Sequence, residues 1–207
     1  MKSCLLLTIV SVAIFSACSE APQKVAEKAP EAPPEPISGS TAFFRMYTAA
    51  RGWLADVQGL RMTSINLPDV KKVPGKAAAW QVTFVSAEKQ RARPYTFSVI
   101  EAPSNLHKGV FALGEEGWTG TRGPAKPFLI QGLKIDSDAA YETALKKGKR
   151  VAEYIKANPD KTISFLLEQT SKFPDLTWRV IWGESVGTSN YSVFVDATTG
   201  EYLETMR

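Results

Sequence analysis

The chain has 207 residues, a formal net charge of +4 and one histidine. Both of its cysteines, Cys4 and Cys18, lie near the N-terminus, which excludes a disulfide framework or a Cys/His metal site in the rest of the chain. The balance is only mildly basic and no nucleic-acid-binding motif is present, so we expect no nucleic-acid partner.

The first residues indicate an export signal. Lys2 gives a short positive region, and residues 5–15 are apolar or small. This run is shorter than the about 20 residues that a membrane-spanning helix needs. The motif Phe15-Ser16-Ala17-Cys18 resembles the lipobox of bacterial lipoproteins, with Phe15 where that family usually has leucine. The resemblance implies that Cys18 is lipidated and becomes the first mature residue; an ordinary secretory signal that contains a cysteine is the alternative.

Lipid on Cys18 predicts a chain anchored to a membrane in the cell envelope, outside the cytoplasm. Ser19 stands where an aspartate would favour the inner membrane in well-studied double-membrane bacteria, so the outer membrane is expected. Residues 20–38 are rich in Pro, Ala, Glu and Lys and lack aromatic residues, and such a segment cannot bury enough apolar surface to offset its ordering entropy. We predict a signal peptide over residues 1–17 and an extended tether over residues 18–38.

Residues 39–102 predict a first helix-plus-sheet unit. Apolar residues recur at helical spacing from Phe43 to Val57, after a cap at Ser40 or Thr41 and before Gly59. A short strand is expected over residues 60–67. Alternating residues predict two further strands, over residues 78–86 and 94–101, joined as a hairpin.

Residues 103–135 are rich in glycine and proline and predict a connecting loop region. A second unit is expected over residues 136–207. It would contain a helix from Asp136 or Ser137 to about Asn158, a helix over residues 162–171, and strands over residues 176–184, 190–196 and 201–205.

The two predicted units share a strand pattern. Trp80-Gln81-Val82-Thr83-Phe84 matches Trp178-Arg179-Val180-Ile181-Trp182 about a hundred residues later. One interpretation is a degenerate internal duplication; the other is that any two amphipathic hairpins look alike at this level. We therefore predict an α+β fold of two similar units, each with a helix packed on an antiparallel sheet.

The segment Asp196-Ala197-Thr198-Thr199-Gly200 lies between two predicted strands and resembles the C-terminal hairpin of PepSY and PepSY-like domains. The resemblance implies a small helix-plus-sheet module of exported proteins that binds partners and, in some members, restrains peptidases. It implies no catalytic residue. Asp196 and Gly200 are expected to form a tight turn, since aspartate accepts backbone hydrogen bonds and glycine adopts positive φ.

The sequence shows no catalytic or metal-binding constellation. His107 is expected in a surface loop, and no cofactor is predicted. Trp118, between glycines, either caps the joint of the two units or contacts a ligand or partner, and Arg91 and Arg93 form a local basic cluster.

We predict a non-catalytic envelope module that binds a protein or peptide partner through a sheet face or the connecting loop, with Trp118, Arg91 and Arg93 as candidate contact residues. A structural subunit of a surface assembly and an envelope hydrolase that uses carboxylates are the alternatives. The sequence makes no prediction of the oligomeric state.

Overall fold

The computed structural model describes residues 33–120 and 123–207. The predicted signal peptide, Cys18 and most of the predicted tether lie outside these residues. In chain order the elements are β1 (Ile37–Ser38), α1 (Gly39–Trp53), β2 (Gln58–Ile65), β3 (Lys76–Ala77), β4 (Ala79–Ser86), β5 (Arg91–Ser98), β6 (Gly109–Ala112), β7 (Glu116–Gly117), β8 (Ala125–Lys126), the 3₁₀ turn η1 (Ile130–Gly132), α2 (Ser137–Lys147), α3 (Val151–Ala157), β9 (Ile163–Thr170), β10 (Thr177–Trp182), β11 (Ser192–Asp196) and β12 (Tyr202–Met206).

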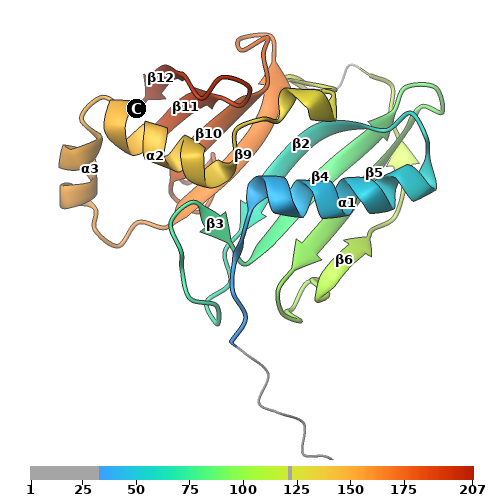
Figure 1. Cartoon of the computed structure of the whole chain (residues 1–207), viewed down its shortest axis with the longest axis horizontal. Helices are drawn as coiled ribbons and strands as arrows, with labels where there is room; N and C mark the ends of the chain where they lie inside the picture. Colours follow the sequence, from blue (N-terminus) through green and yellow to red (C-terminus); the bar gives the residue numbers. More distant parts are fainter. Residues whose placement is uncertain (1–32, 121–122) are drawn as a thin grey trace, which may run out of the picture. The chain divides into compact units, whose positions relative to one another are not determined.

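One antiparallel sheet runs through the described part of the chain. Its main path has the strand order β12-β11-β10-β9-β2-β4-β5-β6, with β7 added to β5 and β8 added to β9 (Figure 1). At the centre β2 pairs with β9, and Met62 lies opposite Leu167. The α+β class is confirmed, but the sheet is continuous and is not divided between two separate units.

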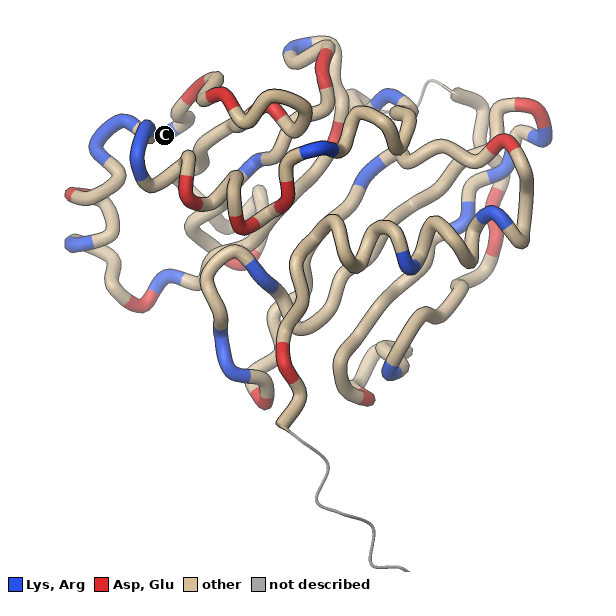
Figure 2. The backbone as a smooth tube through the Cα atoms, in the orientation of Figure 1, with Lys and Arg blue, Asp and Glu red and all other residues tan. Residues whose placement is uncertain are grey.

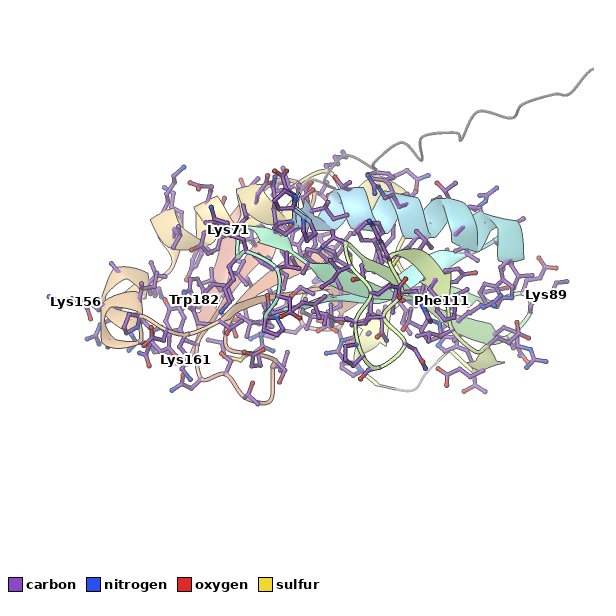
Figure 3. All side chains as sticks on the ribbon, turned by 90° about the horizontal axis from the view of Figure 1, so that it is seen from below. Lys71, Lys89, Phe111, Lys156, Lys161 and Trp182 are labelled. Carbon is purple, nitrogen blue, oxygen red and sulfur yellow. The ribbon has the colours of Figure 1, made fainter. Side chains whose placement is uncertain are left out.

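Helices α1 and α2 lie on the same face of the sheet (Figures 1 and 3), where α1 contacts β4 and β5 and α2 contacts β10 and β11. Alternate strand residues point toward these helices and form the core. Its largest fully buried side chains include Trp80, Phe84, Trp178 and Trp182. Each such burial contributes about 1.5–3 kcal/mol, which explains why the aromatic pattern is so regular on this face. Within the described residues, no helix is long and apolar enough to cross a membrane.

The two halves of the sheet place a tryptophan in equivalent surroundings. Trp80 Nε1 donates to the carbonyl oxygen of Ile37 at 3.1 Å, and Trp178 Nε1 donates to that of Ile135 at 2.8 Å. In each half the accepting residue comes just before a helix. The two indole rings meet edge to face, with centroids 6.2 Å apart. This common arrangement accounts for the repeated Trp-x-Val pattern, whereas duplication of the sequence stays a prediction.

The N-terminus of α1 is capped by residues at the start of α2. The backbone N–H of Gly39 donates to Ser137 Oγ at 2.8 Å, and that of Ser40 donates to Asp136 Oδ1 at 2.8 Å. Ser137 Oγ in turn donates to the carbonyl oxygen of Gly75 at 2.5 Å. Because the first N–H groups of a helix have no partner within it, side chains that accept from them stabilise the helix. The first helix therefore depends on the second half of the chain.

The predicted helix over residues 162–171 is wrong, because this segment is strand β9. Phe165 and Leu167 belong to the core beneath the helices, while Leu166 is buried on the opposite face. With apolar residues on both faces, the strict alternation of a half-buried strand is lost, and periodicity alone does not separate strand from helix. Pairing with β2 on one side and β10 on the other decides the structure.

Other predicted boundaries also change. The first helix ends at Trp53, because Leu54 is already in an extended conformation. Gly59, predicted as the residue that ends the helix, lies within β2 and bonds to the backbone of Phe128. The helix predicted up to Asn158 is interrupted between α2 and α3, where Arg150 adopts a φ of 57°.

Two predicted irregular segments contain regular structure. The region of residues 103–135 includes strands β6, β7 and β8 and is not a loop throughout. The end of the predicted tether is structured, since Pro36 is buried and β1 pairs with β3. Its last residues belong to the fold because the Ile37 carbonyl accepts the indole N–H described above.

The turn between β11 and β12 confirms the roles predicted for Asp196 and Gly200. Asp196 Oδ1 accepts from the backbone N–H groups of Thr198 at 2.7 Å and Thr199 at 2.8 Å. Gly200 has a φ of +80° and its N–H donates to the Asp196 carbonyl oxygen at 2.9 Å. The Asp196 carboxylate thus provides an acceptor for two backbone N–H groups of the turn, and Gly200 adopts the positive φ that other residues avoid.

Candidate functional site

A cavity of about 230 Å³ opens on the sheet face opposite α1 and α2. In Figure 3 the two helices lie above the sheet, and this second face points downward. The cavity lies over the strands of the second half and the turn between β9 and β10; the side chains that matter below are Glu168, Lys172, Phe173, Arg179, Phe194 and Met206. Strand alternation explains their position: Trp178 and Val180 face the helices, so Arg179 between them faces the cavity.

Arg179 has only weak partners. In register it lies between Leu166 and Phe194, and its guanidinium carbon is 5.1 Å from the centroid of the Phe194 ring. Its Nη2 lies 3.5 Å from Met206 Sδ, and a thioether sulfur is a weak acceptor. Its Nε is buried and has no hydrogen-bond partner among the described residues. Burial lowers the pKa of Arg179, which the nearby Glu168 carboxylate opposes.

Many of the charged residues lie in turns and helices and fewer in the strands (Figure 2), so a charged group in a central strand needs an explanation. Glu168 in β9 lies opposite Arg61 in β2, with 3.7 Å between Arg61 Nε and Glu168 Oε2. Burial raises the pKa of Glu168 above its ordinary value, while Arg61 and Arg179 act in the opposite direction. Glu168 can balance one of these two arginines, and the second leaves one positive charge unmatched.

Aromatic rings form one wall of the cavity. Phe173 and Phe194 stack with centroids 4.7 Å apart and planes inclined by 29°. The Lys172 ammonium lies 5.1 Å from the Phe173 centroid and 5.9 Å from that of Phe194, and it also pairs with Glu204 at 2.6 Å. The charge of Lys172 is therefore balanced locally. The wall presents apolar ring surface beside the arginine.

The arginines predicted as contact residues lie in the other half of the sheet, in β5. The Arg93 guanidinium lies 5.9 Å from the Trp53 ring centroid, and its Nε donates to the Leu113 carbonyl oxygen at 2.9 Å. Arg91 Nε is 3.9 Å from Glu115 Oε1. Both side chains thus contact other parts of the first half, and the cavity described above is formed without them.

Trp118 directly follows β7, the short strand that pairs with Arg91 and Ala92 of β5. Its backbone N–H donates to the Gln90 carbonyl oxygen at 2.9 Å, at the turn between β4 and β5 and away from the central β2–β9 pair. Arg91 pairs with Gly117, and Ala92 pairs with Glu116. Alternation therefore directs Glu116 to the face of Ala92, away from the face of Arg91. The role of Trp118, Arg91 and Arg93 as contact residues for a partner stays a prediction.

His107 is exposed, and its Nδ1 lies 3.2 Å from Glu101 Oε2. Within residues 33–120 and 123–207, no three side chains of the kinds that bind metals gather in one place. Cys18, the predicted lipidation site, lies outside the described residues.

Sequence reasoning missed the cavity residues. One signal was present: Arg179 is a charged residue at an outward-facing position of a strand whose next outward residue, Ile181, is buried. The position of Phe173 in a turn between two strands could not be predicted, because the segment before it was predicted as a helix. Phe194 was predicted as part of a strand, but its contact with Phe173 depends on the turn after β9.

No family model matches the chain, and no curated protein matches it. Among solved structures, the chain is similar to the crystal structure of a "putative lipoprotein" from Clostridium difficile 630, with a TM-score of 0.45 and 11% sequence identity. The match covers 79% of this chain and 91% of that one.

Proposed function

We propose that the chain is a lipid-anchored, non-catalytic module of the cell envelope that binds a peptide or protein partner in the cavity beside Arg179. The lipobox-like motif ending at Cys18 supports the location, and Ser19 supports the outer membrane. The observation that carries the binding role is the pairing of an aromatic wall, Phe173 and Phe194, with an arginine that has only weak partners.

The chemistry of the lining favours recognition. Ligand sites are typically apolar with a few polar groups that fix orientation, and here two rings and a thioether surround one guanidinium. The cavity of about 230 Å³ is smaller than the roughly 300–1,000 Å³ of sites for drug-sized ligands, so it suits one side chain of a larger partner. Glu168 also lines the cavity and pairs with Arg61 at 3.7 Å.

Peptides fixed through their N-termini, with the last residues varied, test this function. We expect a subset ending in large apolar residues to bind the chain. Phe173→Ala removes half of the stacked wall and should weaken their binding about tenfold or more, which corresponds to at least about 1.4 kcal/mol.

The matched control is Phe44→Ala, which removes a ring that is 48% exposed on α1, outside the cavity. This variant should bind the peptides like the unchanged chain. Absence of any bound peptide, or equal binding by the Phe173→Ala variant, would show that the cavity is not the binding site.

A further inference from the structure

From the charge of the same cavity we infer that the partner is recognised by its chain end: its C-terminal carboxylate pairs with Arg179 while its last, apolar side chain packs on Phe173 and Phe194. This inference rests on the proposed function and adds the chemical class of the ligand.

The first step is the unmatched charge. Glu168 pairs with Arg61 at 3.7 Å and Glu204 pairs with Lys172 at 2.6 Å, so each carboxylate near the cavity has its own cation. No carboxylate lies within ion-pair distance of Arg179 among the described residues. A carboxylate on the ligand would supply the missing negative charge beside Arg179.

The second step is the geometry of the donor. A guanidinium presents a planar fork of N–H groups that matches a carboxylate with two parallel hydrogen bonds, which are about twice as strong as neutral ones. At present the fork of Arg179 has a sulfur atom at 3.5 Å and a ring face as partners, and its Nε is buried without an acceptor. A carboxylate in the cavity would pair with the Nη groups, where it replaces a weak sulfur acceptor with a charged oxygen acceptor.

The third step is the size of the space. A cavity of about 150 Å³ holds a benzene molecule. The 230 Å³ beside Arg179 therefore accommodates one large apolar side chain and the carboxylate attached to the same residue. A chain end places these two groups on one residue, whereas an internal acidic residue brings a carboxylate without the apolar side chain.

Heptapeptides that end in phenylalanine test the inference when each is prepared as the free acid and as the C-terminal amide. Titration calorimetry with the chain should give at least tenfold tighter binding of the acid. Arg179→Gln should remove the difference between acid and amide, and Arg179→Lys, which retains charge but not the fork, should restore it only in part. Urea unfolding of each variant verifies that it is folded.

Arg45→Gln is the matched control, since the Arg45 guanidinium also lies over a ring, 5.1 Å from the Phe97 centroid, but outside the cavity. It should leave the preference for the acid unchanged. Equal binding of acid and amide, with binding still lost in Phe173→Ala, would overturn the inference and leave the proposed function intact. If neither form of any peptide binds, both fail. Binding of decanoate through Arg179 without binding of peptides would overturn the inference in favour of a free fatty acid.

Discussion

Replacement of Ser137 by alanine tests the contact between the two halves of the fold. The side chain is fully buried, accepts from the Gly39 N–H at 2.8 Å and donates to the Gly75 carbonyl at 2.5 Å. Alanine leaves both backbone groups buried without this partner, at about 1–3 kcal/mol for each unsatisfied group. Because a carbonyl tolerates the loss better than an N–H, we expect Ser137→Ala to lower the free energy of unfolding by about 2–4 kcal/mol in total.

Urea unfolding followed by tryptophan fluorescence measures this change, since Trp80 and Trp178 are buried near the contact. For a chain of this size, 1 kcal/mol corresponds to about 2–4 °C, so the melting temperature should fall by about 5–15 °C. Hydrogen exchange should also show faster exchange of the Gly39 amide.

Thr48→Ala provides the control, because it removes a hydroxyl that bonds to the Phe44 carbonyl on the exposed side of α1. We expect this change to stay within about 0.5 kcal/mol. If the Ser137→Ala and Thr48→Ala variants unfold at the same urea concentration, the capping contact does not stabilise the fold as argued.

Two further predictions concern the sheet. At Gly59, an added Cβ would lie 2.5 Å from the Phe128 ring, so Gly59→Ala should destabilise the chain by about 1–3 kcal/mol in urea unfolding. The control Gly52→Ala adds a Cβ in open space on α1 and should stabilise the chain by about 0.5–1 kcal/mol. Equal effects of the two alanines would refute the steric argument. Burial raises the pKa of Glu168, so the carboxyl proton is bound more tightly in the native state than in the unfolded chain. The contribution of Glu168 to stability therefore falls as the pH rises from its ordinary pKa of 4.5 through the pKa in the folded state. The free energy of unfolding of the Glu168→Gln variant minus that of the unchanged chain should therefore increase as the pH rises from 4 to 7. A decrease in this difference would mean that the pairing with Arg61 outweighs burial.

The strands of the fold could be predicted where one face is buried and the other is not. In β4, Trp80, Val82 and Phe84 alternate with Gln81 and Thr83, and the strand was predicted almost to the residue. Strand β9 could not be predicted in the same way because it is central and buried on both faces. Its identity is decided by its neighbours in the sheet, which lie about a hundred residues away in β2.

The site was beyond sequence reasoning for a related reason. Trp118, Arg91 and Arg93 were selected because large or charged side chains in loops and turns often contact partners, but Arg91 and Arg93 lie within strand β5, where their contacts depend on neighbouring elements. Arg179 was selected by no motif. Its importance follows from what lies across the strands from it, Phe194 on one side and Leu166 on the other, and that register is a property of the folded sheet.

The cap of α1 by Asp136 and Ser137 also has a consequence for the order of events during synthesis. The ribosome releases the N-terminal half first, yet the acceptor for the Gly39 N–H comes 98 residues later in the chain. One edge of strand β2 likewise stays unpaired until β9 has formed beside it. Contacts between such distant segments require closure of a long loop and slow folding. The emerging first half therefore exposes an unpaired strand edge until its partner arrives, and over that interval it is open to chaperones and to aggregation.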